Sequence, residues 1–383
     1  MFCSTNLLLG QSEPITIGEL PFEINETSGL IQYNDRLITH NDSGNLPQLY
    51  EIDKNTLEIT RIVTVANVVN TDWEDITQDD DFIYIGDIGN NNGNRTDLKI
   101  LRIRKSDYDV LDTVTAETIS YAYEDQTSFI SDRNNDFDAE ALLVFGDDLL
   151  IFTKEWQSRG TVAYRIPKLP GDFTAVNIGT YQIDGLVTGA AQNSVNANEF
   201  YLVGYSEILL PFFVRFNFQD SATIFSGVIE KSSLNTGIAQ IESITFNAEM
   251  NLFYVTSEEF INQPIINSSA RLFSFSLDDN EDATDDNSDN EEDNEEVEEL
   301  PVTLEEDVII FRPLGESNIQ YSINIPSQLL AIAIYDASGR LLDFNVEENI
   351  ENSVLPTETL STGLYFATFL FEDRRISKAF QKN

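Results

Sequence analysis

Acidic residues recur along the first part of the chain, and a short apolar strand follows each of them about ten residues later. The five recurring segments begin 48, 66, 48 and 54 residues apart, at Glu26, Glu74, Glu140, Thr188 and Glu242. Carboxylates that share one cavity cannot all stay ionised at low cost, so they bind a cation, pair with a lysine or retain protons. If the fold brings these distant positions together, the recurrence therefore predicts a site that binds a cation, pairs with a lysine or holds protons.

An interval of about 50 residues fits one four-stranded propeller blade with its loops. Residues 12–277 alternate apolar strand-like runs with Asn, Asp and Gly turns, which is an all-β pattern. We therefore predict an all-β chain with a five-bladed β-propeller over residues 12–277. The strand over residues 15–20 is expected to complete the fifth blade and close the ring. A β-sandwich is the alternative fold, and the fivefold recurrence argues against it.

A propeller would place the recurring acids and the loops after the second strands around one mouth of its channel, where ligands commonly bind. The ligand-binding candidates are Glu26, His40, Asp42, Glu74, Asp87, Glu140, Lys154, Glu155, Tyr205, Glu242 and Glu258. One hypothesis is a Ca²⁺ ion held by Glu26, Glu74, Glu140 and Glu242, because calcium prefers oxygen ligands. The alternatives are that each glutamate accepts hydrogen bonds that fasten adjacent blades, or that two carboxylates are catalytic.

Three polar loops add further candidates. Residues 41–45 and 89–94 are rich in Asn and Gly, and both follow predicted second strands. Turn chemistry accounts for this composition, and the functional alternative is that the asparagine amides bind a sugar or a peptide. Residues 132–138 resemble the front of a calcium loop, but Phe137 stands where such a loop requires glycine. A polar loop is the preferred interpretation of that segment.

Composition excludes several classes of function. The chain of 383 residues has 22 basic and 66 acidic residues, a net charge of -44, which disfavours nucleic-acid binding and anionic membranes. The single cysteine rules out an intrachain disulfide framework. One histidine and the lack of a Gly-x-Ser-x-Gly motif give little support to nucleophilic hydrolysis. No run of 18 apolar residues predicts a transmembrane helix.

The ends of the chain differ in character from residues 12–277. Residues 1–11 contain Leu7-Leu8-Leu9 and are interpreted as a signal-peptide remnant. Residues 278–302 are interpreted as a disordered acidic linker, because residues 278–299 include 14 Asp or Glu. Residues 303–383 return to a strand-like pattern, and we predict a small C-terminal β-sandwich there.

Two motifs stand close together near the C-terminus. A predicted strand runs into a Tyr-Asp-x-x-Gly-Arg motif, a Leu-x-x-Gly-x-Tyr motif follows, and a final basic strand ends the chain. The residues concerned are Tyr335, Asp336, Gly339, Arg340, Gly363, Tyr365 and Lys378. With these motifs, residues 306–383 resemble the C-terminal sorting domain of the type IX secretion system of Bacteroidetes. The resemblance implies a small β-sandwich, the type IX secretion machinery as partner, and delivery to the cell surface or medium. An ordinary β-sandwich appendage is the alternative.

The segment Asp72-Trp73-Glu74-Asp75 also resembles a sequence at the start of blades in exported five- or six-bladed propellers, which implies the fold alone. We therefore expect an exported or cell-surface propeller that binds an extracellular glycan, peptide or surface protein at an acidic channel mouth. A binding role is preferred over catalysis. The alternative is a calcium-assisted hydrolase of glycosides or phosphoesters that uses the carboxylates of the mouth.

Overall fold

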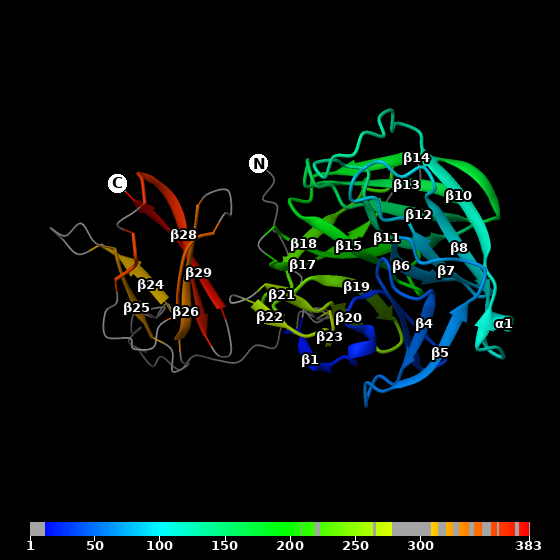
Figure 1. Cartoon of the computed structure of the whole chain (residues 1–383), viewed down its shortest axis with the longest axis horizontal. Coiled ribbons are helices and arrows are strands. Elements are labelled where there is room, and N and C mark those ends of the chain that lie inside the picture. The colour runs from blue at the N-terminus through cyan, green and yellow to red at the C-terminus, as the bar shows by residue number, and fades with distance from the viewer. Residues whose placement is uncertain are drawn as a thin grey trace, which may run out of the picture. The chain divides into compact units, whose positions relative to one another are not determined.

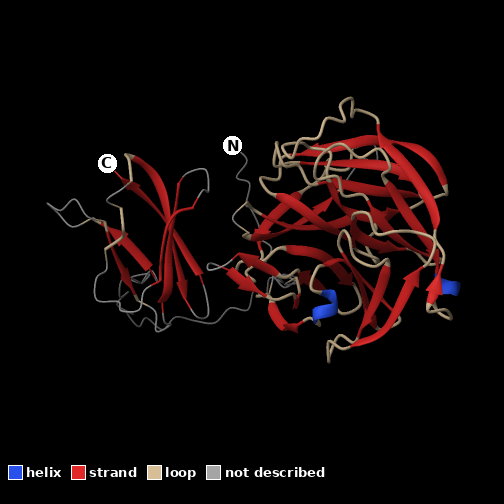
Figure 2. Cartoon of the chain, viewed as in Figure 1, coloured by secondary structure: helices blue, strands red, loops and turns tan. Residues whose placement is uncertain are grey.

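The structure, a computed structural model, divides into two compact units, with the division between Glu281 and Asp282. It describes residues 12–207, 209–218, 223–262, 266–277, 308–312, 319–324, 329–336, 341–346, 354–357, 360–371 and 375–382. The predicted signal-peptide remnant and the predicted acidic linker lie outside these residues. Strands dominate both units (Figure 2), so the predicted all-β class is confirmed.

Five successive groups of four strands can be followed along the first unit (Figure 1), with β9 (Thr113–Val114) as an addition to the first group. The second and third groups join into one eight-stranded sheet, because residues 119–123 pair in parallel with residues 171–175. The first two groups are β2 (Thr27–Tyr33), β3 (Arg36–Asn41), β4 (Gln48–Ile52) and β5 (Ile59–Val65), then β6 (Trp73–Gln78), β7 (Phe82–Asp87), β8 (Lys99–Arg104) and β10 (Glu117–Tyr123). The next two are β11 (Ala139–Phe145), β12 (Asp148–Thr153), β13 (Thr161–Pro167) and β14 (Gly171–Tyr181), then β15 (Leu186–Gln192), β16 (Glu199–Tyr205), β17 (Pro211–Asn217) and β18 (Ile229–Ser233). The fifth is β19 (Ile241–Asn247), β20 (Leu252–Ser257), β23 (Arg271–Phe275) and β1 (Ile15–Glu19).

The remaining elements of the first unit are short. A hairpin of β21 (Phe260–Asn262) and β22 (Ile266–Ser268) lies between β20 and β23 in the chain. A 3-10 turn covers Phe22–Ile24, and the helix α1 covers Lys105–Tyr108. None of the helices among the described residues is long and apolar enough to span a membrane.

Turn residues explain where the hairpins reverse. Asn34 and Asp35 connect β2 to β3 with φ angles of 46° and 61°, which is the conformation of a tight hairpin turn and suits these two residue types. Gly146 has a φ of 60° between β11 and β12, and Asn251 has a φ of 48° between β19 and β20. At the turns that join the first two strands of a group, the sequence thus supplies Asn, Asp or Gly, which tolerate the left-handed backbone conformation.

The five groups form a closed circle. Each first strand packs against the first strand of the next group, and β19 packs against β2. Apolar clusters fill the spaces between successive sheets. One joins Val63 of the first group to Leu101 of the second, and another joins Leu272 of the fifth group back to Leu37 of the first. The carboxyl-terminal and amino-terminal parts of this unit are therefore held together by buried apolar surface.

Strand β1 is the outermost strand of the fifth group. It pairs antiparallel with β23, with Ile15 opposite Ser274 and Glu19 opposite Arg271. The backbone N–H of Leu20 also donates to the carbonyl of Ala270 at 2.8 Å. The predicted strand at residues 15–20 therefore pairs with the last group, as expected, and covers an otherwise open edge.

The second unit consists of two sheets around one core. The strands β24 (Val308–Phe311) and β25 (Gln320–Ile323) form one sheet, and β27 (Leu341–Val346), β26 (Leu329–Asp336), β28 (Gly363–Phe371) and β29 (Arg375–Lys382) form the other in that order. Tyr321 of the smaller sheet packs with Ile334 and Phe369 of the larger one. Two sheets that share a core in this way have the layout of a small β-sandwich.

The residues of the sorting motif lie mainly on the two central strands of the larger sheet. Tyr335 and the backbone of Asp336 belong to β26, opposite Phe366 and Tyr365 of β28. The Tyr365 hydroxyl donates to the Ser361 carbonyl at 2.9 Å, and its ring stacks on Phe380. Gly363 begins β28 and Lys378 lies on β29, whereas Gly339 and Arg340 lie outside the described residues.

Candidate functional site

A bulge at the start of every inner strand sets the position of the recurring residues. In β2, β6, β11, β15 and β19 the pairing with the second strand skips one residue near the start. The skipped residues are Gly29, Glu74, Glu140, Thr188 and Glu242. A bulge leaves its residue without a ladder partner and redirects its side chain. Four of the five predicted repeat positions are thus structurally equivalent.

The first repeat position was assigned to the wrong residue. Gly29 occupies the bulge of β2 with a φ of 59°, and a side chain there would lie 2.7 Å from the backbone nitrogen of Ile76. Glu26 precedes the strand and is exposed, where Asn45 donates a hydrogen bond to its carboxylate. The shift of three residues arises because close contact between β2 and β6 requires glycine at the bulge.

Side chains beside the bulge glutamates fasten neighbouring inner strands. Asp75 is one of them, because its buried carboxylate accepts the backbone N–H groups of Ile76 and Leu142 at 2.8 and 2.7 Å. The hydroxyl of Ser28 donates to the Glu74 carbonyl at 2.5 Å, and that of Thr188 donates to the Ile241 carbonyl. Glu140 and Glu242 also link neighbouring groups, because Lys154 joins Glu140 to Tyr205 and Tyr205 hydrogen-bonds to Glu242.

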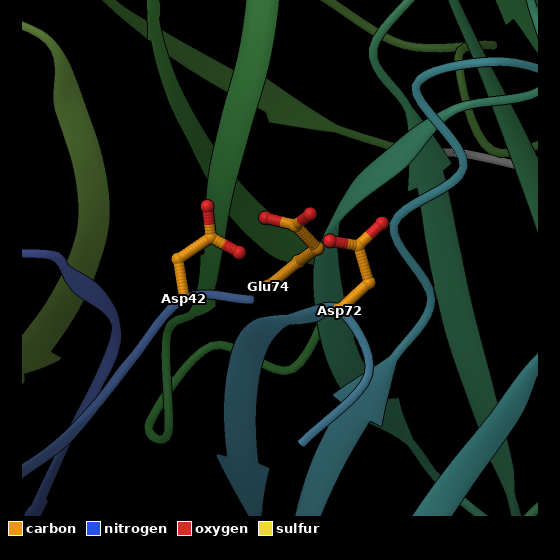
Figure 3. A group of neighbouring side chains, drawn as sticks. All are labelled: Asp42, Asp72 and Glu74. Atoms are coloured by element: carbon orange, nitrogen blue, oxygen red, sulfur yellow. The ribbon is translucent and has the colours of Figure 1, made fainter. Parts of the chain in front are cut away.

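Three carboxylates meet where β3 ends and β6 begins. Oxygen atoms of Asp42, Asp72 and Glu74 all lie within 4.8 Å of one another. Figure 3 shows the Glu74 carboxylate between those of Asp42 and Asp72, with all three side chains pointing to the same side. Glu74 is 4% exposed. Gly89 packs against the cluster so closely that a Cβ atom there would lie 2.1 Å from Glu74 Oε1.

A buried lysine neutralises a second group of acids. Lys154 Nζ lies 2.5 Å from Glu140 Oε2 and donates to the Tyr205 hydroxyl at 3.1 Å. Gln240 also donates to that hydroxyl, at 3.2 Å. Burial alone would lower the pKa of Lys154, but the carboxylates of Glu140 and Glu242 outweigh it and raise that pKa. Lys154 therefore stays charged within this group.

Burial and mutual repulsion raise the pKa values of several acidic side chains around these two groups. Burial, with Asp42 as the next cause, raises the pKa of Glu258 to about 8. Burial raises the pKa of Asp42 to about 6, with charge repulsion from Glu26 and Asp138 adding to it. Burial and then Asp42 and Asp138 raise the pKa of Asp72 to about 7. These side chains interact across three loops, so the fold does bring many of the predicted acids together.

Asp138 holds the edge of this region in place. It follows the polar loop 132–138 and is fully buried. Its carboxylate accepts the backbone N–H of Asn90 at 2.6 Å and the indole N–H of Trp156 at 2.8 Å. Asp138 therefore positions both the asparagine-rich loop and the one tryptophan beside it. The loop itself is closed by turn hydrogen bonds such as Asn134 N–H to Asp132 at 2.9 Å.

Three predicted residues have roles outside the carboxylate cluster. Asp87 is fully buried and pairs with Arg95 at 2.8 Å and with Lys99 at 2.9 Å. Glu155 accepts hydroxyl hydrogen bonds from Thr153 and Ser158. His40 packs edge-on against Trp73, and burial lowers its pKa to about 4, so it is neutral at ordinary pH. We assign these three side chains to the support of the loops and the core.

A polar pocket opens beside the carboxylates. It has a volume of about 510 Å³, and Asp72 is one of its walls. The lining residues are Ser43, Asp72, Asn90, Asn91, Asn92, Asn94, Arg95, Arg133 and Trp156. Arg95 is held by Asp87 and by the Gly89 carbonyl at 2.7 Å, so its side chain forms a fixed part of the pocket. The asparagine-rich loops predicted to face the mouth therefore contribute most of the lining.

Sequence reasoning missed several of these residues for identifiable reasons. Asp72 lies just before the recurring Glu74, and only the bulge brings the two carboxylates together. Arg95 and Trp156 come from loops whose length differs between groups, so they have no counterpart in the repeat. The three polar loops predicted from the sequence were usable signals, because Ser43, Arg133 and four asparagines of residues 90–94 line the pocket.

The comparison with protein families concerns the second unit. Residues 315–383 match the model of the family described as the secretion system C-terminal sorting domain. The predicted resemblance is thereby confirmed, and residues 315–383 are a type IX sorting domain. Such a domain interacts with the type IX secretion machinery and directs export to the cell surface or medium. No curated protein matches the sequence.

Three solved structures share distant similarity with the chain. Hydrazine synthase of Kuenenia stuttgartiensis has 11% identity and a TM-score of 0.35, over 70% of this chain and 62% of that one. The structure of U3-55K has 6% identity and the same TM-score, over 70% and 99%. The RRP9 WD40 repeats have 6% identity and a TM-score of 0.35, over 71% and 99%. The description of the fold therefore rests on the strand pairing and the packing of this chain.

Proposed function

We propose that the first unit is a five-bladed β-propeller, with blades made by the five groups and closed by β1. Two features support this proposal. The first strands of the groups contact one another in a closed circle, and each pair of neighbouring sheets shares an apolar cluster. The bulges then lie at equivalent points of five blades, and the pocket lies at one face of the ring.

We further propose that the exported chain binds a glycan in this polar pocket. The observation that carries the proposal is the lining of the pocket, which includes four asparagines, Asp72 and Trp156. Planar amides and carboxylates form paired hydrogen bonds with vicinal hydroxyls, and the flat apolar face of an indole packs against a sugar ring. Asp138 accepts the indole N–H of Trp156 at 2.8 Å, so the ring is oriented before a ligand arrives.

A binding function is preferred over the hydrolase because several of the buried acids already have partners. Glu140 is paired with Lys154, and Asp138 accepts two hydrogen bonds that hold the pocket together. A glycosidase needs two carboxyl groups that face the scissile bond from opposite sides. Asp72 is the one carboxylate among the described lining residues.

The test is a glycan array probed with the purified full chain, followed by calorimetry on the best ligand. Trp156→Ala and Asn92→Ala are expected to weaken binding at least about tenfold, the effect of losing one well-placed contact. Asn55→Ala, at an exposed turn outside the pocket, serves as the matched control. Binding that is unchanged in both pocket variants would refute the proposal, and release of shorter saccharides would favour the hydrolase.

A further inference from the structure

We propose that Asp42, Asp72 and Glu74 form a binding site for a calcium ion at the wall of the polar pocket. This inference does not depend on the glycan, because it concerns binding of the ion alone. The three residues differ from the glutamate ring that the sequence predicted, since only Glu74 is common to both sets. They come from the loop after β3, the loop before β6 and the bulge of β6.

The spacing of the oxygen atoms suits calcium. Ca²⁺ takes oxygen ligands at about 2.3–2.6 Å, so two ligands on opposite sides of the ion are about 5 Å apart at most. The three carboxylates place oxygen atoms within 4.8 Å of one another, which lies inside that limit. The site offers oxygen ligands and no imidazole or thiolate, whereas zinc favours nitrogen and sulfur. Calcium therefore fits the ligand chemistry better than zinc does.

Glu74 provides a second and independent observation. Its side chain is 4% exposed, and within the described part of the chain its carboxylate accepts no hydrogen bond. Buried carboxylates are normally paired or hydrogen-bonded, because an unpartnered buried charge is costly. In Figure 3 this carboxylate points into the space between Asp42 and Asp72. A cation in that space would supply the missing partner.

The protein's own cations near the cluster are already engaged. Arg95 lies 3.9 Å from Asp72 Oδ2, but it is closer to Asp87, at 2.8 Å. Lys154 is 2.5 Å from Glu140 and also donates to Tyr205. Neither cation is therefore closely paired with the three carboxylates, and a divalent ion would allow them to ionise together better than either side chain does.

Gly89 explains how the cluster stays compact. A methyl group at this position would lie 2.1 Å from Glu74 Oε1 and 2.5 Å from Asp72 Oδ2. The Gly89 N–H donates to the Asp72 carbonyl at 3.2 Å, which fixes the loop against the start of β6. Bare backbone thus lets the two carboxylates approach each other from one side, and Asp42 approaches from the other.

The experiment uses the full chain after removal of metal with a chelator. Calcium binding is measured by calorimetry, and the melting temperature is recorded in EDTA and in calcium. The wild-type chain is expected to bind at least one calcium ion with a Kd below about 1 mM, the upper end of the range for extracellular sites, and to melt at a higher temperature in calcium. Asp72→Asn and Glu74→Gln are expected to weaken this binding at least tenfold.

Two controls keep the result interpretable. Asp80→Asn removes an exposed acid outside the cluster and should bind calcium like the wild type, and all variants keep the acidic run at residues 278–299. In EDTA, Glu74→Gln should melt at or above the wild-type temperature, because it removes a buried carboxyl group whose ionised form burial and the neighbouring acids destabilise. Equal calcium binding and equal calcium-dependent stabilisation in the wild type and both cluster variants would overturn the proposal.

Discussion

At the scale of single residues, the buried pair of Lys154 and Glu140 is the most consequential contact. Both side chains are 6% exposed, so neither can turn to water if its partner is lost. Replacing one partner of a buried ion pair leaves an uncompensated charge and costs about 3–5 kcal/mol. We expect Lys154→Met to lower the free energy of unfolding in urea by that amount.

A double variant separates charge from packing at this site. Lys154→Met combined with Glu140→Leu removes both charges, so we expect it to recover most of the stability lost in Lys154→Met. Urea denaturation in one buffer compares the stability of the wild type, Lys154→Met and the double variant. Equal stability of Lys154→Met and the wild type would show that Glu140 is already neutral in the folded chain.

The bulge residues show how far the sequence could predict the candidate site. Glu74, Glu140 and Glu242 were recognised from their spacing, because each begins an apolar strand of the same pattern. Gly29 was not recognised, since a glycine has no side chain to mark the bulge. Asp72 was overlooked for another reason. Trp73, between the two acids, is buried, and Glu74 occupies the bulge of β6, so the carboxylates of Asp72 and Glu74 come close together.

At the scale of elements, a turn of the second group is fastened to the third. Asp79, in the turn between β6 and β7, accepts hydrogen bonds from Lys168 at 3.0 Å and from Tyr84 at 2.9 Å. Burial by itself would raise the pKa of Asp79, but these hydrogen bonds outweigh it and lower the pKa below the ordinary value of 3.8. The ionised carboxylate therefore stabilises the folded chain.

This contact predicts a defined dependence of stability on pH. A carboxyl group with a lowered pKa stabilises the fold above the unfolded value of 3.8, and that stabilisation is lost as the pH falls through the folded value. Asp79→Asn should thus cost about 1–3 kcal/mol at pH 7 and progressively less in acid. Asp80→Asn, at the exposed neighbouring position, is the control. A cost for Asp79→Asn that does not change with pH would contradict this account.

The strand β1 offers a second test at this scale. A chain that begins after Leu20 loses the pairing with β23 and the burial of Leu20, which alone contributes about 1.5–3 kcal/mol. We expect lower stability in urea and association through the exposed edge of β23. A chain that begins at residue 12 keeps β1 and is the matched control. If both truncations unfold at the same urea concentration, β1 does not stabilise the circle.

Strand positions were more predictable than the short connections between them. The sequence predicted a strand over residues 15–20, and β1 spans Ile15–Glu19. The hairpin of β21 and β22 and the added strand β9 were not predicted. Both are only two or three residues long per strand, so they have too few residues to show a period.

At the scale of the whole molecule, the net charge of -44 has two separate origins. Part of it lies in the acidic run of residues 278–299, and part belongs to the first unit, where burial concentrates carboxylates around one pocket. Recurrence in the sequence could predict that such a gathering exists. It could not predict which carboxylates face one another, because that depends on loops of unequal length between the repeats.

The sorting domain leads to a prediction about the location of the protein. In a bacterium with a type IX secretion system, the full chain is expected in the medium or on the cell surface. A chain without residues 315–383, the segment that matches the sorting-domain family, should instead accumulate in the periplasm. Cell fractionation and immunoblotting measure this directly. The first unit keeps its own apolar clusters, so the retained protein should be folded and should still bind calcium if Asp42, Asp72 and Glu74 hold the ion.

A matched deletion distinguishes recognition of the domain from an effect of chain length. Removing residues 278–302 shortens the chain but leaves the sorting motifs around Tyr335 and Tyr365 in place, so export should continue. The substitution Tyr365→Ala tests the motif more finely, because it removes the hydrogen bond to the Ser361 carbonyl and the stacking on Phe380. We expect it to reduce export, since the secretion machinery then meets a destabilised domain. Normal export of the chain lacking residues 315–383 would contradict this role for the domain.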